Sequence, residues 1–167
     1  MVADELQIVA YHRRHDRSTF NSGEPVVDDW LRLHASSSDR QHTTKTFLAL
    51  EGENVVGYYA STMCQLDLQE SVAVRNGARY PIPAIVLARL AVDINSQGKG
   101  IGRCLIGHAL TGYAKVAEAV GFEVIVVHAL NESASNYYRQ FGFKPLPEGS
   151  NTLFLTVKDL LASMPKD

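Results

Sequence analysis

The stretch of sequence that decides the fold spans residues 84–130 and reads AIVLARLAVDINSQGKGIGRCLIGHALTGYAKVAEAVGFEVIVVHAL. Its first ten residues, Ala84–Asp93, are almost continuously apolar, which is typical of a strand buried on both faces of a sheet. Apolar residues then recur at helical spacing from Ile101 to Val120, and Gly121 ends that pattern. A second apolar run follows at Phe122–Leu130. The order strand, helix, strand predicts a βαβ unit.

The residues before this unit predict a strand, a helix and a hairpin. A first strand is expected at Leu6–His12, and a helix from about Pro25 with Ser22 as its cap. The expected apolar face of this helix comprises Val26, Val27, Trp30, Leu31 and His34. Residues 45–68 predict a hairpin around the turn EGEN. Residues 69–83 are expected to form a loop, with a loop that contains a short irregular element as the alternative.

The residues after the unit predict one more helix and one more strand. Ser133 is expected to cap a short helix that Gly142 closes, and residues 151–157 to form a last strand before a terminal helical turn. This element order predicts an α/β fold with a mixed sheet. No repeat, low-complexity tract or linker interrupts it, so a single domain over residues 1–167 is expected.

The composition sets limits on function. A net charge of −2 over 167 residues does not by itself indicate a nucleic-acid-binding protein. Cys64 and Cys104 lie in apolar runs and are expected to be buried and unpaired, as in a reducing cytoplasm. His12 and His15 stand apart from other ligands, so no metal site is expected. No signal peptide or membrane-spanning stretch is evident, and a cytoplasmic protein without membrane association is expected.

Three glycines alternate with other residues in QGKGIG (97–102). This segment connects the expected strand Ala84–Asp93 to the long helix that begins at Ile101. A helix N-terminus offers unpaired N–H groups and a partial positive charge, and glycines let the backbone curl around an anion. The amides of residues 98–103, with the charges of Lys99 and Arg103, therefore predict a phosphate site. The alternative is a glycine-rich bend without a ligand.

Two familiar phosphate motifs do not fit this turn. A Walker A loop needs four residues between its first glycine and a Gly-Lys-Ser/Thr ending. A dinucleotide fingerprint needs G-x-G-x-x-G in the first βα unit of the fold, whereas this spacing is G-x-G-x-G and lies late in the chain. The sequence also lacks the serine, histidine and aspartate arrangement of a hydrolase elbow.

Two motifs together resemble the GNAT superfamily of N-acetyltransferases. RLAVDINSQGKGIGRCLI (89–106) is similar to the acetyl-CoA-binding segment of that family, with the pattern Q/R-x-x-G-x-G/A. Its three defined positions are filled by Gln97, Gly100 and Gly102. NYYRQFGF (136–143) resembles the second signature of the family. Its defined positions are filled by Tyr137, Tyr138, Gly142 and Phe143.

This resemblance implies a mixed, mostly antiparallel sheet with two central parallel strands splayed apart and helices on its flanks. It implies that the amide-rich arm of acetyl-CoA pairs with strand backbone and that the pyrophosphate lies on the glycine turn. Asn131 matches a position that hydrogen-bonds the cofactor arm, with a plain helix-initiating role as the alternative. The cofactor-binding residues implied are Leu90, Ala91, Val92, Gln97, Gly98, Lys99, Gly100, Ile101, Gly102, Arg103, Asn131 and Tyr138.

Acetyl transfer from a thioester to an amine needs a neutral amine, a polarised carbonyl and a proton for the leaving thiolate. The resemblance places Tyr138 beside the thioester sulfur, where its phenol would act as the acid. Packing is the alternative role, and it is the expected role of the neighbouring Tyr137.

A general base is harder to find. The strand at Ala84–Asp93 carries Arg89 and Asp93 but no carboxylate at its centre, and His128 on the next strand is either a base or a core histidine. A lysine amine, with a pKa of about 10.4, needs a base, whereas an α-amine, with a pKa of about 8, is already partly neutral. The sequence therefore favours an α-amine substrate.

A closer resemblance covers most of the chain between Phe20 and Phe143. FNSGEPVVDDWL, TFLALEGENVVGYYA, PIPAIVLARLAVD and VHALNESASNYYRQFGF resemble the GNAT toxins of bacterial type II toxin–antitoxin modules. This implies acetylation of the α-amine of aminoacyl-tRNA, which blocks translation, with a ribbon–helix–helix antitoxin as partner and a homodimer as the assembly. The alternatives are a non-toxic acetyltransferase of a small-molecule amine or protein N-terminus, and a non-catalytic CoA-binding module, against which Tyr138 argues.

Basic residues are clustered although the whole chain is slightly acidic. One group comprises Arg75, Arg79, Arg89, Lys99 and Arg103, and YHRRHDR (11–17) forms a second. Phosphates supply most of the affinity for RNA, so such clusters suit a tRNA acceptor stem. Arg75 and Arg79 are candidate RNA contacts or plain surface residues. Arg89 lies in an apolar strand, where a charge must be paired or must line a cleft, and is expected at the cleft or its dimer-side rim.

Overall fold

A computed structural model describes residues 5–147 and 150–165 of the chain. The chain divides into two compact units. Unit 1 combines the chain up to Thr62 with Ala88–Ala109, and unit 2 combines Met63–Leu87 with the chain from Leu110 onward.

The strands form a seven-stranded sheet in the order β1-β2-β3-β4-β5-β7-β6. They are β1 (Leu6–Ala10), β2 (Lys45–Glu51), β3 (Asn54–Gln65), β4 (Pro83–Val92), β5 (Val124–His128), β6 (Lys144–Pro145) and β7 (Thr152–Thr156). The helices are α1 (Pro25–Asp29), α2 (Ala35–Arg40), α3 (Leu68–Val74), α4 (Ile101–Ala119), α5 (Glu132–Arg139) and α6 (Val157–Ser163). β4 and β5 are a parallel pair and the sheet is otherwise mostly antiparallel, so the predicted mixed α/β fold is confirmed.

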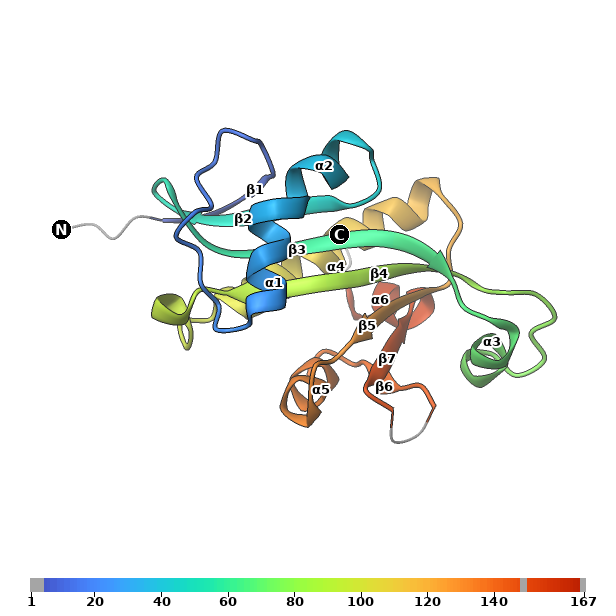
Figure 1. Ribbon diagram of the computed structural model, residues 1–167. Helices are drawn as coiled ribbons and strands as arrows, with labels where there is room; N and C mark the ends of the chain where they lie inside the picture. The colour runs from blue at the N-terminus through green and yellow to red at the C-terminus, as the bar shows by residue number, and fades with distance from the viewer. Residues whose placement is uncertain (1–4, 148–149, 166–167) are drawn as a thin grey trace. The chain divides into compact units, whose positions relative to one another are not determined.

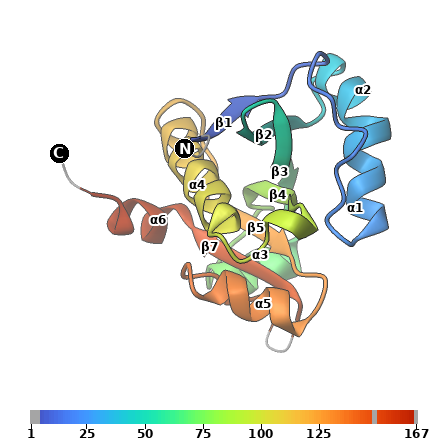
Figure 2. The same cartoon turned by 90° about the vertical axis from the view of Figure 1, so that its left-hand side faces the viewer.

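Unit 1 is layered, with helices on both faces of β3 (Figure 2). On one face, Tyr58 is fully buried, stacks on Trp30 with ring centroids 6.0 Å apart and meets Phe20 edge-on at 5.7 Å. Together with Tyr11 these residues belong to one buried cluster, called the aromatic cluster below. On the other face, Gly57 lies against the first turns of α4. The strand alternation thus brings a large ring to one side and a glycine to the other.

Gly57→Ala is expected to destabilise the protein by about 1–3 kcal/mol, the usual cost of overpacking. A Cβ at this position would lie 3.0 Å from Leu105 Cδ1 and 3.1 Å from the carbonyl oxygen of Ala91. The carbonyl belongs to β4 and has little freedom to move away. Urea unfolding measures the effect, with Gly112→Ala as the control because a Cβ there meets nothing within 4 Å. Equal stability of both variants would show that this packing is loose.

Unit 2 contains the parallel pair and the last strands (Figure 1). Ala84 to Leu87 of β4 pair with Val124 to Val127 of β5, and the helix α4 connects the two strands, so the predicted βαβ unit is confirmed. β7 pairs antiparallel with β5 on one side and with β6 on the other. Although β4 continues to Val92, its parallel register ends at Leu87.

One helix was not expected from the sequence. Residues 69–83 were predicted to form a loop, but α3 occupies Leu68–Val74. Its capping box explains why it forms: the Asp67 carboxylate accepts from the amide of Glu70 at 2.7 Å, and the Glu70 carboxylate accepts from the amide of Asp67.

Both predicted serine caps are wrong. Glu24 precedes α1 without a side-chain cap, while Ser22 donates its hydroxyl to the buried Asp28 carboxylate at 2.6 Å. At α5 the cap is Asn131 rather than Ser133, because the Asn131 side-chain oxygen accepts from the amide of Ala134 at 2.8 Å. A side-chain oxygen therefore caps α5, whereas α1 begins without one.

The predicted apolar face of the first helix is only partly correct. Trp30 and Leu31 are buried, but Val26 is 80% exposed. Residues 30–34 form a π-helical turn in which the amide of Ala35 donates to the carbonyl of Trp30. The additional residue in this turn leaves His34 exposed and brings Ala35 into the core instead.

Other burial expectations also fail. Val116 and Val120 were placed on the apolar face of the long helix, and both are exposed. Cys64 and Cys104 are free thiols, but Cys64 is only half-buried and Cys104 is exposed. None of the helices described is long and apolar enough to cross a membrane.

Candidate functional site

The predicted phosphate turn follows directly from β4 in unit 1 and is held by backbone hydrogen bonds. The amide of Asp93 donates to the carbonyl of Val56 at 2.9 Å, and the amide of Ile94 donates to the carbonyl of Asn21 at 2.8 Å. The Asp93 carboxylate accepts from the amides of Asn95 and Asn21 at 2.9 and 3.1 Å. It thereby caps the short 3₁₀ turn Ile94–Ser96. Asp93 therefore holds in place the backbone that precedes the glycines.

Gln97 has a structural role at this turn. Its side-chain amide donates to the carbonyls of Val92 at 3.0 Å and Ser22 at 3.1 Å. These two bonds tie the start of the glycine segment to the end of β4 and to the loop before α1. The glutamine that opens the motif thus positions the backbone that follows it.

Two glycines of this turn adopt backbone conformations that other residues rarely adopt. Gly98 has φ of 80° and Gly100 has φ of 85°, in the left-handed region that favours glycine. A Cβ at either position would meet nothing within 4 Å, so open space lies beside the turn. The first turn of α4 follows, and its first amides have no acceptor inside the helix. Lys99 and Arg103 are exposed on this turn. The arrangement suits an anion with several oxygen atoms.

The strand residues Leu90, Ala91 and Val92 lie immediately before the turn. Ala91 is buried in the aromatic cluster, while Leu90 and Val92 are half-buried. All three come after the last residue of the β4–β5 register. The structure therefore brings together, within unit 1, the strand end and the whole predicted segment from Gln97 to Arg103.

Asn131 and Tyr138 lie in unit 2 on α5, at its first and last turns (Figure 1). The side-chain oxygen of Asn131 caps the helix, which leaves its NH₂ group as the part available to a ligand. Tyr138 is 8% exposed and packs edge-on against Phe143 with centroids 6.0 Å apart. Tyr137 is half-buried and meets Phe141 edge-on at 5.4 Å.

The environment of Tyr138 keeps its phenol protonated. Burial, with a smaller contribution from the neighbouring Tyr137, raises the pKa of Tyr138 to about 12. A buried phenol of this kind is not ionised near neutral pH, so it carries the proton that a thiolate forming beside it needs.

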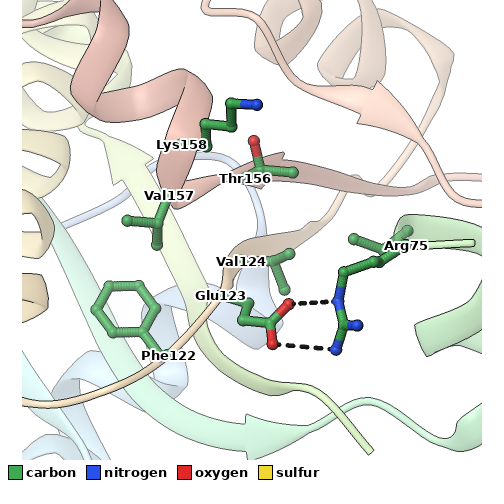
Figure 3. Close-up of a pocket in the computed structure, with 8 residues that line it drawn as sticks. Arg75, Phe122, Glu123, Val124, Thr156, Val157 and Lys158 are labelled. Carbon is green, nitrogen blue, oxygen red and sulfur yellow. Dashed lines mark hydrogen bonds and ion pairs between the residues drawn. The ribbon is translucent and has the colours of Figure 1, made fainter. Parts of the chain in front are cut away.

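Arg75 does not stand free for an RNA contact. It forms a bidentate ion pair with Glu123, with N–O distances of 3.1 and 3.3 Å (Figure 3). The pair lies at a pocket of about 310 Å³ in unit 2, lined by Val74, Arg75, Phe122, Glu123, Val124, Thr156, Val157 and Lys158. Because the partners are 48 residues apart, no local pattern predicts this pair.

Arg89 and Arg79 differ from Arg75 in their surroundings. The Arg89 guanidinium lies over the Trp30 ring, 4.4 Å from its centroid, and no described carboxylate pairs with it. Burial lowers the pKa of Arg89, and Tyr58 acts in the opposite direction. Arg79 is exposed. The charge of Arg89 thus meets an aromatic ring rather than a carboxylate, and its place at the cleft or dimer-side rim stays a prediction.

His128 is not a core histidine. It is exposed at the end of β5, where its Nδ1 atom lies 3.0 Å from the Thr152 hydroxyl. In the described part of the chain, no group of three or more His, Cys, Asp or Glu residues is arranged to hold a metal ion.

Comparison with known proteins gives consistent matches over nearly the whole chain. The acetyltransferase (GNAT) domain model matches residues 42–145. The tRNA-acetylating toxin of Mycobacterium tuberculosis is 35% identical over 148 residues, which cover 88% of this chain and 89% of that protein.

Two solved structures of the toxin AtaT are also similar. One, a tyrosine-to-phenylalanine mutant bound to acetyl-CoA and the C-terminus of the antitoxin AtaR, is 29% identical, with a TM-score of 0.81 and coverage of 95% of this chain and 97% of that one. The other, AtaT complexed with acetyl-methionyl-tRNAfMet, is 27% identical, with a TM-score of 0.82 and coverage of 95% and 98%.

Proposed function

Since this chain belongs to the GNAT acetyltransferase family, we propose that it is a toxin that acetylates the α-amine of aminoacyl-tRNA and so blocks translation in the cytoplasm. Acetyl-CoA is the acetyl donor in this proposal. The observation that carries the choice of acceptor is the 35% identity to a tRNA-acetylating toxin over 88% of the chain. AtaT bound to acetyl-methionyl-tRNAfMet supports the same acceptor class.

The donor site of the proposal is the segment Leu90–Arg103. When bound, acetyl-CoA supplies an acetyl thioester and a pyrophosphate. The glycine turn fits a pyrophosphate because Gly98 and Gly100 leave open space where a Cβ would project. The amides at the start of α4 donate to the phosphate oxygens, and Lys99 and Arg103 balance the charge. The backbone of Leu90 to Val92 pairs with the amide-rich arm.

In this proposal the protein orients the two substrates and supplies one proton to the leaving group. The α-amine attacks the thioester carbonyl, so a C–N bond forms while the C–S bond breaks. Tyr138 donates its phenolic proton to the departing sulfur, and the amine loses a proton to water. An α-amine with a pKa near 8 is partly neutral at pH 7, so no strong base is required.

The proposal also includes the partners of such a toxin. A ribbon–helix–helix antitoxin binds the chain, and two copies of the chain form a homodimer. Structures of AtaT with its antitoxin AtaR support an antitoxin partner. Co-purification with the protein encoded by the adjoining reading frame and sedimentation analysis measure these two features.

One assay decides between the acceptor classes. Labelled acetyl-CoA is supplied together with charged tRNA, a polyamine and a protein with a free N-terminus. Label is expected on the aminoacyl group and to be released as N-acetyl amino acid after mild alkaline hydrolysis of the ester. Label found only on the polyamine or the protein would establish the non-toxic alternative instead.

Two substitutions of Asn131 distinguish its helix-capping role from its proposed role in cofactor binding. Asn131→Asp keeps a capping oxygen but removes the NH₂ donor, so stability is expected to stay within about 0.5 kcal/mol while the KM for acetyl-CoA rises about fivefold. Asn131→Ala removes both and is expected to cost about 1 kcal/mol in addition. Thermal unfolding and initial rates measure the two effects. An unchanged KM in Asn131→Asp would restrict this residue to its capping role.

A further inference from the structure

A second polar pocket lies in unit 1 and has no part in the donor site described above. It has a volume of about 320 Å³ and is lined by His15, Asp16, Arg17, Ser18 and Arg32. The first four residues belong to the loop between β1 and α1, and Arg32 comes from the π-helical turn that follows α1. Two guanidinium groups therefore meet from segments that are 15 residues apart in the sequence.

Arg17 is held in place by an aromatic residue rather than an acid. Its Nη1 donates to the Tyr11 hydroxyl, and its guanidinium carbon lies 4.9 Å from the centroid of the Tyr11 ring. Its Nε is buried and, within the described part of the chain, has no hydrogen-bond partner. A buried N–H donor without an acceptor is costly, so an acceptor oxygen that reached this group would relieve that cost.

Arg32 is also oriented by the protein. Its Nη1 donates to the carbonyl of Phe20, and its Nη2 donates to the Asp29 carboxylate at 3.0 Å. The Asp29 side chain is 57% exposed, so solvent weakens this ion pair. A guanidinium carries five N–H donors, and these contacts use only two. Both arginines are thus fixed in position with donors remaining.

The pocket also contains one carboxylate, which is already engaged. Oδ1 of Asp16 accepts from the hydroxyl of Ser18 at 2.6 Å and from its amide at 2.9 Å. Because Asp29 lies beside Arg32, the two arginines face two carboxylates, and the excess positive charge comes from further arginines on the loop. Exposed Arg13 and Arg14 lie on the same loop. A row of cations beside a pocket suits the repeating phosphates of a nucleic-acid backbone better than the single charge of a peptide carboxylate.

We propose that the pocket of Arg17 and Arg32 binds a backbone phosphate of the RNA acceptor. The proposal rests on the proposed function, since it assigns part of the acceptor site to unit 1. It also places this contact on Arg17 and Arg32, which Tyr11 and the carbonyl of Phe20 orient, whereas two donors of Arg75 are held by Glu123.

The test measures tRNA affinity and acetylation separately. Arg17→Gln and Arg32→Gln in the full chain are compared with Arg40→Gln, an exposed arginine of the same unit. Fluorescence anisotropy of labelled tRNA gives Kd, and initial rates give the KM values for charged tRNA and acetyl-CoA. Each pocket variant is expected to raise Kd and the tRNA KM about tenfold, with the acetyl-CoA KM unchanged within about twofold. The slope of log affinity against log salt should fall by about 0.7–0.9 per lost phosphate contact.

Two further variants guard against misfolding as the cause. Arg17→Lys keeps the charge and is expected to retain more affinity than Arg17→Gln at a similar unfolding temperature. Asp16→Asn removes the like charge and is expected to tighten tRNA binding about threefold. A structural role of the loop alone would weaken binding in all of these variants.

Several outcomes overturn the proposal. Unchanged tRNA Kd and salt slope in the Arg17→Gln, Arg32→Gln double variant exclude the pocket from RNA binding. Inorganic phosphate that binds saturably below about 1 mM, without displacing tRNA, marks a site for free phosphate instead. Variants that keep tRNA affinity but lose antitoxin binding assign the pocket to the antitoxin.

One outcome separates this proposal from the proposed function. If the pocket variants lose tRNA affinity while the wild-type chain acetylates no tRNA, the pocket is an RNA-binding site and the proposed function is wrong.

Discussion

Tyr138→Phe is expected to lower turnover at least about 100-fold while leaving acetyl-CoA affinity unchanged within about twofold. The ring keeps its edge-on packing against Phe143, so the fold loses little. No described residue shares a hydrogen bond with the Tyr138 hydroxyl, so its removal breaks no internal bond. What is lost is the proton for the departing sulfur. Single-turnover rates and calorimetric titration with CoA measure the two quantities.

The pH profile gives an independent check on this role. Burial raises the pKa of Tyr138 to about 12, so the acid form persists through the neutral and moderately alkaline range. Activity is therefore expected to rise as the α-amine deprotonates near pH 8 and to show no decline from Tyr138 up to about pH 10. Tyr137→Phe is the matched control and should keep the wild-type rate. Full turnover in Tyr138→Phe would remove the residue from the mechanism.

Gly100→Val is expected to weaken acetyl-CoA binding about 100-fold, which corresponds to the loss of two charge-assisted hydrogen bonds at about 1.5 kcal/mol each. A β-branched residue does not tolerate a φ of 85°, so the backbone must turn and its amides leave the phosphate. The side chain would also enter the open space assigned to the ligand. Isothermal titration with acetyl-CoA gives the affinity directly.

Gly107→Val provides the matched control for this substitution. Gly107 is an exposed glycine within α4, and a Cβ there meets nothing within 4 Å. Valine has a higher helix propensity than glycine, so stability should not fall and acetyl-CoA affinity should stay at the wild-type value. Wild-type affinity in Gly100→Val as well would show that the turn does not hold the pyrophosphate.

The parts of the fold that the sequence predicts are those fixed by local patterns. Continuous apolar runs predict β4 and β5, and the long helical periodicity predicts α4, because burial on one or both faces is a local property of such segments. The helix α3 was missed since its periodicity is weak, although Asp67 and Glu70 have the spacing of a capping box. This capping-box spacing is a local signal for the start of α3.

The candidate site likewise has one part that a local sequence pattern predicts and another part that depends on tertiary contacts. The positive φ angles of Gly98 and Gly100 require glycine, so the turn is visible in the sequence. The ion pair of Arg75 with Glu123 depends on chain segments that meet only in the folded state. The same holds for Arg89 over Trp30, 59 residues away. Side chains that meet across such separations are set by tertiary packing, which one sequence does not encode in a local pattern.

The π-helical turn at Trp30–His34 acts as a phase shift in the middle of a helical segment. Removing one residue there would restore regular α-helical spacing and rotate everything that follows by about 100°. Ala35 would then leave the core, and α2 would present a different set of side chains to β2. Trp30 opens this turn, so it would keep its place under Arg89 if a later residue of the turn were removed. The length of this turn therefore sets the orientation of α2 independently of the aromatic ring that supports the arginine.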